Sequence, residues 1–365
     1  MSLNVGIVGL PNVGKSSIFN ALTSAGARVE SFPFSTIEPN HGIVPVPDAR
    51  LDALRRLLSP PTVVPASLEV VDIAGLVRGA HRGEGLGNQF LGHIREVDAI
   101  VHVLRCFGGE VAHVDGSVDP LRDLAVVEIE LVLADLDVVE RRLEKIEREV
   151  KVGVKQAQKQ QPFLGAFAEV LRAGKALHEQ SWDEPALALG RELGLLTLKP
   201  VLYVANVDEP QLKSGAEPLA TLGRQLAARG RRLVPLVAAL EAEIAELGDP
   251  AEQAPFLAEL GLSEPGLNRL VREAYALLSL VTFYTFVGGK ELRAWSLREG
   301  TAAPQAAGKI HTDFERGFIR AEVVAFDDFV EHGSEAAVRE RGLLRSEGKE
   351  YRIQDGDIVH FRFNV

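Results

Sequence analysis

The sequence has few of the features that mark secreted or membrane-bound proteins. A single cysteine among 365 residues, Cys106, excludes an internal disulfide. No apolar run approaches the roughly 18 residues that a membrane-spanning helix needs. The first residues also show no basic, apolar, cleavable leader. These absences predict a cytoplasmic protein without a membrane partner.

An excess of positive charge is absent as well. Lys and Arg total 40 against 51 Asp and Glu, so the formal net charge is −11. Because this global charge repels phosphate, any nucleic acid must meet a local basic surface. With 46% hydrophobic and 25% charged residues the chain is otherwise ordinary for a folded protein. At roughly 100 to 200 residues per domain, its length predicts two or three domains.

The first and middle parts of the chain alternate apolar runs with helix-like segments. Strands are expected at residues 4–9, 41–46, 67–72, 99–105, 200–206 and 232–237, and an amphipathic helix at 48–58. Such alternation predicts an α/β fold, a mostly parallel sheet with helices on both faces.

Two segments depart from this pattern. Residues 120–195 are charged and strand-free, and their apolar positions predict a long helix that ends at Pro162 and a partner helix over 163–179. From residue 281 dense β-formers predict a small β-rich domain. The expected domains are thus 1–119 joined with 196–278, a helical hairpin insertion at 120–195, and 279–365.

Residues 9–16, GLPNVGKS, match the phosphate-binding loop G-x-x-x-x-G-K-[ST] between a predicted strand and a predicted helix. Backbone N–H groups of such a loop converge on phosphates, and glycine is needed where a side chain would block the approach. Lys15 is expected to reach the β- and γ-phosphates, and Ser16 to offer its hydroxyl to Mg²⁺.

Further magnesium and phosphate contacts are expected on the loops that follow. Asp72 ends a predicted strand and would organise Mg²⁺, while Gly75 could sense the γ-phosphate through its N–H. Thr36, in the loop before the second strand, is the expected second hydroxyl ligand. Taken singly, Asp72 could be a helix cap and Thr36 a turn residue.

The base-recognition motif is altered. GTPases of this class read guanine with Asn-Lys-x-Asp, whereas this strand ends with Asn206, Val207, Asp208 and Glu209. The changes favour ATP or relaxed selectivity over strict GTP, because adenine lacks the N1–H and 2-amino donors that the aspartate accepts. Residues 237–240, which include Ala238 and Ala239, are placed to close the other side of the base.

The water-orienting glutamine of small GTPases is missing, since Leu76 follows Gly75. Hydrolysis then needs another group or is slow. His113, in a glycine-bearing loop after the strand at 99–105, is a candidate for positioning water; the alternative is a solvated loop histidine.

Together with residues 72–87 (DIAGLVRGAHRGEGLG) and 283–295 (FYTFVGGKELRAW), these motifs resemble the YchF subfamily of Obg-like P-loop nucleotidases. The resemblance covers essentially the whole chain. It implies a nucleotidase domain interrupted by a helical hairpin, a C-terminal TGS domain of β-grasp type, a preference for ATP over GTP, and weak hydrolysis. It also implies association with ribosomes and a role in translation and stress control.

The resemblance assigns roles to individual residues as well. Phosphate-binding residues would be Asn12, Val13, Gly14, Lys15, Ser16 and Ser17. Mg²⁺ would bind Ser16 and Thr36, and Asn206 with Val207 would hold the base. The loop histidine of family members that have a hydrophobic residue in place of the glutamine corresponds to His113. Asn12 also resembles that of relatives activated by K⁺, which makes K⁺ a candidate cofactor.

A basic face is expected on the long helix, formed by Arg141, Lys145, Arg148, Lys155 and Lys159. It could lie along ribosomal RNA of the large subunit, together with the TGS domain, or be a solvated helix face. Three functions remain open: an ATP-hydrolysing switch on the ribosome, a nucleotide-gated binding module with incidental hydrolysis, and a GTPase of large-subunit assembly.

Overall fold

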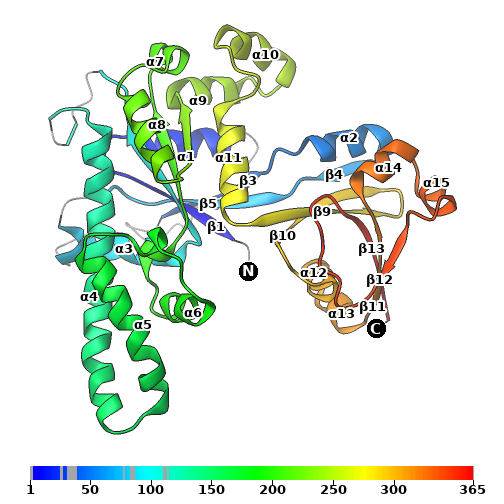
Figure 1. Ribbon diagram of the computed structural model, residues 1–365. Helices are drawn as coiled ribbons and strands as arrows, with labels where there is room; N and C mark the ends of the chain where they lie inside the picture. Colours follow the sequence, from blue (N-terminus) through cyan, green and yellow to red (C-terminus); the bar gives the residue numbers. More distant parts are fainter. Residues whose placement is uncertain are drawn as a thin grey trace. The chain divides into compact units, whose positions relative to one another are not determined.

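The structure, a computed structural model, describes residues 3–24, 28–30, 39–76, 79–82, 87–109, 113–114 and 116–364. The chain forms two compact units (Figure 1). Unit 1 comprises Met1–Ile43 and Glu69–Leu270, and unit 2 comprises Val44–Leu68 and Val271–Val365. Within the described ranges, no helix is both long and apolar enough to cross a membrane.

Unit 1 is built on a seven-stranded sheet. Its strands, in spatial order, are β2 (Arg28–Glu30), β3 (Asn40–Pro45), β5 (Ser67–Asp72), β1 (Asn4–Val8), β6 (Ala99–Arg105), β7 (Val201–Asn206) and β8 (Leu233–Leu236). The neighbours from β5 to β8 pair in parallel, and β2 pairs with β3 antiparallel. The predicted α/β fold is confirmed. Because β1 is flanked by β5 and β6, the loops that follow these strands meet at one edge.

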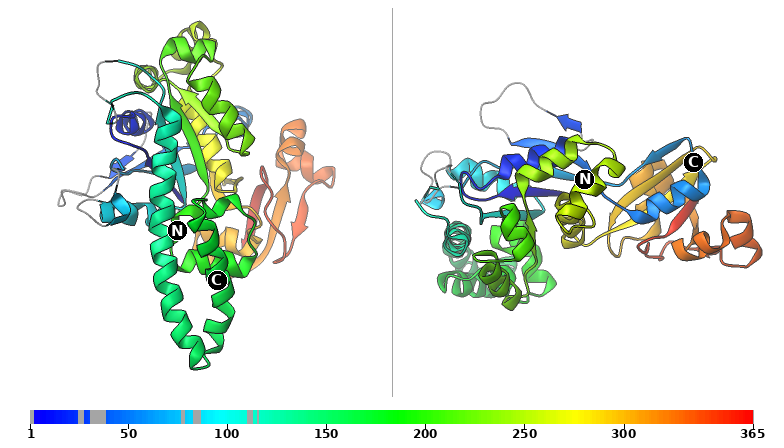
Figure 2. Two further views of the ribbon diagram at one scale, coloured as in Figure 1. Left: turned by 60° about the vertical axis from the view of Figure 1, so that its left-hand side comes forward. Right: turned by 90° about the horizontal axis from the view of Figure 1, so that it is seen from above.

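The helices of unit 1 lie around this sheet, as the views in Figures 1 and 2 show. They are α1 (Lys15–Ser24), α3 (Gly87–Glu96), α4 (Pro120–Lys151), α5 (Lys155–Arg172), α6 (Glu184–Glu192), α7 (Glu209–Ser214), α8 (Leu219–Ala228), α9 (Ala238–Glu246) and α10 (Pro250–Glu259), with 3₁₀ turns η1 (Ala80–Arg82), η2 (Leu177–Glu179) and η3 (Leu196–Leu198). Helix α11 (Gly266–Leu277) includes the boundary between the units.

The helical hairpin is formed by α4 and α5, which run side by side (Figure 2). Val139, Ile146, Leu164 and Phe167 are fully buried between them, each with 0% exposure. The predicted break at Pro162 was wrong, because Pro162 lies inside α5. The chain turns at residues 152–154 instead, where Gly153 adopts a φ of +82° and its N–H donates to Val150 O. Glycine tolerates this left-handed conformation, which ends helices.

This turn also changes the predicted basic face. Arg141, Lys145 and Arg148 lie on α4, whereas Lys155 and Lys159 lie on α5. They therefore do not share the face of one helix, and that expectation was wrong. We define residues 148–155 as the hairpin tip; it carries Arg148, Lys151 and Lys155, all exposed.

Unit 2 contains a six-stranded sheet. Its strands, in spatial order, are β12 (Arg345–Glu347), β11 (Phe318–Val324), β13 (Ile358–Phe363), β9 (Leu280–Val287), β10 (Glu291–Arg298) and β4 (Thr62–Val64). The helices are α2 (Ala49–Leu58), α12 (Ala303–Ile310), α13 (Thr312–Arg316), α14 (Phe326–His332) and α15 (Glu335–Glu340). A β-rich C-terminal unit is thus present, as expected.

The segment Val44–Leu68 differs from the expected domain division, which placed it with the first part of the chain. Strand β4 pairs in parallel with β10, and Asp48 accepts a hydrogen bond from Tyr284. Arg50 Nη1 donates to Asp355 at 2.8 Å. These hydrogen bonds join residues far apart in the sequence and explain why the segment belongs to unit 2. The periodic pattern of apolar residues does not predict such bonds.

Candidate nucleotide-binding site

The phosphate loop follows β1 and leads into α1, as the motif requires. A side chain on Gly9 would place its Cβ 2.5 Å from Val103 O, so the loop lies directly against β6. Asn12 has a φ of 64°, a left-handed conformation that asparagine tolerates better than most residues. The first N–H groups of α1, from Lys15 onward, have no carbonyl of their own helix to bond and suit an anion.

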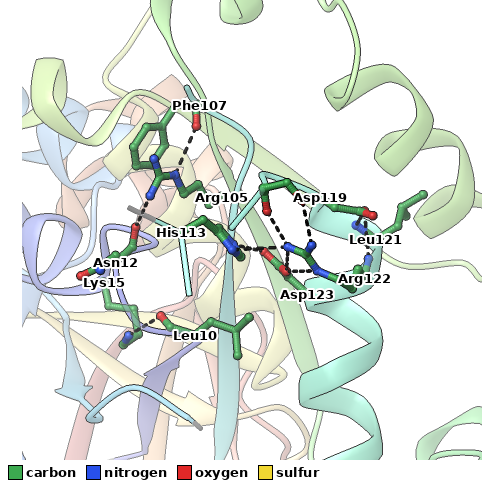
Figure 3. Close-up of polar contacts among 11 residues, drawn as sticks. Leu10, Asn12, Lys15, Arg105, Phe107, His113, Asp119, Leu121, Arg122 and Asp123 are labelled. Atoms are coloured by element: carbon green, nitrogen blue, oxygen red, sulfur yellow. Dashed lines mark hydrogen bonds and ion pairs between the residues drawn. The ribbon is translucent and has the colours of Figure 1, made fainter. Parts of the chain in front are cut away.

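Lys15 is buried in the loop, at 7% exposure, and its Nζ donates to Leu10 O at 2.8 Å (Figure 3). Burial lowers the pKa of Lys15 to about 8, although the nearby Asp72 carboxylate opposes this shift. A side chain on Gly75 would place its Cβ 3.2 Å from this Nζ. The ammonium and Gly75 therefore lie next to each other, where both were expected to face the γ-phosphate.

Ser16 and Asp72, the two described residues expected at the Mg²⁺ site, are in direct contact. Ser16 Oγ donates to Asp72 Oδ2 at 3.0 Å. Burial raises the pKa of Asp72, while Ser16 and Lys15 act in the opposite direction. The donor set suits Mg²⁺, which keeps several waters and needs only one or two protein oxygens beside substrate phosphates. The other expected ligand, Thr36, lies outside the described residues.

Within the described part of the chain, no cluster of three or more His, Cys, Asp or Glu side chains is placed to hold a metal. A magnesium site of the P-loop type needs no such cluster. Ser16 with Asp72 is then the part of the protein that would hold the ion.

Asn206 joins the phosphate loop to the opposite side of the site. Its Nδ2 donates to Val13 O at 3.0 Å, and its Oδ1 accepts from Ala238 N at 3.1 Å. A Cβ on Gly14 would lie 2.2 Å from Asn206 Nδ2. The amide was expected to contact the base; in this structure its oxygen and one N–H hold the phosphate loop and α9 together.

The other residues expected near the base occupy different surroundings. Val207 is buried, at 2% exposure, and its N–H donates to Leu236 O. Glu209 begins α7 and forms an exposed ion pair with Lys213 at 2.8 Å. Ala238 and the exposed Ala239 form the first turn of α9, beside Asn206. The structure thus brings Ala238 to the loop through Asn206, while Glu209 is engaged with Lys213.

His113 is not a solvated loop residue. Its side chain is 2% exposed, and its Nε2 lies 2.7 Å from Asp123 Oδ2. Arg122 Nη2 lies 3.3 Å from Nδ1 (Figure 3). To position water at the phosphate, the ring would have to leave this pair, so a catalytic role for His113 stays a prediction.

Leu76, in the position of the missing glutamine, is fully buried. Its backbone N–H donates to Gly9 O at 3.1 Å, which fixes the residue after Gly75 to the end of β1. An apolar side chain in this environment cannot orient an attacking water.

Arg105 is a supporting residue that the sequence interpretation missed. It ends β6, is 1% exposed, and its guanidinium donates from Nε to Phe107 O at 3.2 Å and from Nη1 to Asn12 O at 3.4 Å. It also lies over the Phe107 ring (Figure 3). An arginine at the end of an otherwise apolar strand was the available signal.

Known proteins are similar to this chain over its whole length. A family profile described as "50S ribosome-binding GTPase" matches residues 4–160. A second, named for the C-terminal part of YchF GTPases and described as "Protein of unknown function (DUF933)", matches residues 280–364. The "Ribosome-binding ATPase YchF" of Haemophilus influenzae is 49% identical over 100% of both chains.

The chain belongs to the YchF family. The "Ribosome-binding ATPase YchF" of Bacillus subtilis is 48% identical over 100% of both chains. The solved structure of the Schizosaccharomyces pombe YchF GTPase superposes with a TM-score of 0.88 at 36% identity, covering 99% of this chain and 98% of the yeast chain. The YchF assignment confirms the family resemblance and the P-loop fold.

Gly14→Ala should weaken nucleotide binding by at least about tenfold, because Gly14 has a φ of +95° and an added methyl group would meet the Asn206 amide. Titration with a fluorescent ATP analogue measures the loss. Gly92→Ala in α3 is the matched control, since nothing lies within 4 Å of its added Cβ. Equal affinities of the Gly14 variant and the wild type would contradict the loop geometry.

ATP binding should take up protons at alkaline pH. The pKa of Lys15 is about 8 in the free protein, and phosphate would raise it, so affinity should fall as pH rises through 8. Calorimetry in buffers of different ionisation enthalpy should show clear proton uptake, at most one proton per ATP, at pH 9 and almost none at pH 6.5. Absence of uptake at pH 9 would disprove the assignment to Lys15.

Proposed function

We propose that this chain is a Mg²⁺-dependent nucleoside-triphosphate hydrolase that prefers ATP, hydrolyses it slowly, and acts as a regulatory switch on ribosomes in the cytoplasm. The observation that carries the nucleotidase part is the arrangement of Lys15 and the Ser16–Asp72 pair at the mouth of the phosphate loop. Ser16 and Asp72 would hold Mg²⁺, which would supply positive charge against the phosphate oxygens.

The residues of the chain have distinct parts in this reaction. Lys15 would bind the β- and γ-phosphates through its ammonium group, and Gly75 would let the γ-phosphate approach closely. The buried Leu76 leaves the attacking water without a side-chain partner at that position, which supports slow hydrolysis. His113 is retained as the candidate for orienting water, and K⁺ near Asn12 as a candidate activator.

The preference for ATP rests on the base side. Val207 is buried and cannot supply the long stem of the guanine motif, and the Glu209 carboxylate is paired with Lys213. The carboxylate that would accept the N1–H and 2-amino group of guanine is therefore otherwise engaged. Relatives are named both ATPase and GTPase, so nucleotide choice is the property to measure.

Ribosome binding is supported by the names of the relatives and by the hairpin. Segment 141–159 has seven Lys and Arg against three Glu, a local charge of +4 in an acidic chain. The hairpin tip exposes Arg148, Lys151 and Lys155, and Val152 is 79% exposed there. Such a tip can contact RNA phosphates; the large subunit, and a contribution from the C-terminal unit, are parts of the proposal. Large-subunit assembly as a GTPase is the second candidate, favoured by the match to a 50S ribosome-binding GTPase profile.

ATP should displace a labelled ATP analogue at concentrations at least about tenfold lower than GTP. The reason is that a site without a free carboxylate to accept from the N1–H and 2-amino group of guanine leaves these donors unpaired. A clear GTP preference would replace the ATPase proposal with the GTPase one.

Ser16→Ala should weaken ATP binding in Mg²⁺ and leave it unchanged in EDTA, since only the contact with the ion is lost.

Replacing Lys151 and Lys155 by Glu should reduce cosedimentation with ribosomes and lower the salt dependence of binding. Two lost phosphate contacts correspond to a change of about 1.4 to 1.8 in the slope of log affinity against log salt. Replacing Arg172 and Lys175 by Glu, near the other end of α5, changes the charge by the same amount and should leave ribosome binding nearly intact. Equal losses in both variants would indicate non-specific attraction and contradict a role of the tip.

A further inference from the structure

Glu130 is a buried carboxylate in the middle of α4, with 5% exposure. A charged group in such a position is costly unless it is hydrogen-bonded. The phosphate loop, the Ser16–Asp72 pair and the base side make no use of this side chain. Its partners therefore indicate what it does.

Among the described residues, its hydrogen-bond partners lie in the short segment 79–81. Gly79 N donates to Oε1 at 2.7 Å, and His81 N donates to Oε2 at 3.1 Å. His81 Nδ1 lies 2.7 Å from the same Oε2. These partners hold the pKa of Glu130 below its ordinary value against the opposing effect of burial. Each oxygen of the carboxylate thus holds the backbone of this segment.

The segment follows the glycine that faces the phosphate site. Gly75 adjoins Lys15, and Leu76 is bonded to the end of β1. Gly79 is four positions after Gly75 in the sequence, so the contacts of Glu130 follow closely on the glycine beside Lys15. A change at Gly79 or His81 that accompanied the change of nucleotide would act on α4 through their bonds to Glu130.

Helix α4 leads away from the site to the hairpin tip. It has 32 residues, which corresponds to about 48 Å at the usual rise per residue. Its buried contacts with α5 join the two helices into one body. A force applied at Glu130 therefore acts on the hairpin as a whole.

We propose that Glu130 is a positioning residue that holds Gly79 and His81 in place for hydrolysis and transmits the nucleotide state to the helical hairpin. This rests on the proposed nucleotidase function and assigns it a route of regulation. Coupling of this kind requires that ATP and ADP favour different arrangements of the Gly79–His81 contacts.

The competing explanation is a purely structural anchor. Asp135, on the same helix, is such a case: it accepts from the N–H groups of Leu196 and Thr197 at 2.8 and 2.7 Å. Both explanations predict that loss of Glu130 lowers stability. Only the positioning role predicts loss of a difference between nucleotide states.

The test compares Glu130→Gln with the wild type by hydrogen exchange of residues 120–172, in Mg²⁺ with a non-hydrolysable ATP analogue or with ADP. Glutamine keeps the size of the side chain, but its NH₂ group faces an N–H donor and cannot accept. Glu128→Gln is the matched control, because Glu128 lies on the same helix and instead accepts from Tyr203 and pairs with Arg229. His81→Ala keeps the two backbone bonds and guards against a folding defect.

We expect the hydrogen-exchange rates of the wild-type hairpin to differ between the two nucleotide states. In Glu130→Gln the rates in the two states should differ by less than twofold. His81→Ala should give an intermediate value, and Glu128→Gln the wild-type difference. In steady-state hydrolysis, Glu130→Gln should lower kcat at least tenfold with KM within twofold, because ground-state binding stays with the phosphate loop.

A wild-type difference that persists in Glu130→Gln, or that is lost equally in Glu128→Gln, overturns the proposal. So does a wild-type hairpin that exchanges equally in both states. Failure of the proposed function is distinguishable from these outcomes, because it appears as absence of nucleotide binding or of ribosome binding by the wild type.

Discussion

The side-chain amide of Asn206 links parts of the molecule that are far apart in sequence. Its hydrogen bonds to Val13 O and Ala238 N connect the phosphate loop with the helix on the base side. This contact requires Gly14, because any side chain there would occupy the space of the amide. The position of Lys15, and through it that of Gly75, depends on the loop path that Asn206 fixes. One amide thus determines the geometry on which phosphate binding rests.

Helix α4 connects the rest of unit 1 in a similar way, through acidic side chains spaced along its length. Asp123 pairs with His113, Glu130 holds segment 79–81, and Asp135 holds the start of η3. Each carboxylate fixes a loop next to the sheet, and the far half of the helix carries the hairpin. The helix is therefore part of the nucleotide-binding unit, whereas its sequence alone suggested a separate insertion.

Much of the fold and of the phosphate site was predictable because it depends on local patterns. The strands β5 and β6 have the predicted bounds, and the loop of residues 9–16 stands between a strand and a helix as expected. The helix break was misplaced because Pro162 seemed the stronger signal, whereas Gly153 has the left-handed backbone that ends α4. The roles of Arg105 and Glu130, and the burial of His113, depend on tertiary neighbours that sequence spacing does not encode.

The chain leaves unit 1 after Ile43 and supplies α2 and β4 to unit 2 with residues Val44–Leu68. It re-enters unit 1 at Glu69, within β5. No single cut in the chain can therefore separate the two units. Removal of everything after residue 279 would strip β10 from the edge of β4 and remove β10 and α14 from α2, a helix whose Leu51 and Leu54 are buried. A truncated protein would present a bare strand edge and an apolar helix face, which favour aggregation. The C-terminal region is for this reason a folding partner of residues Val44–Leu68.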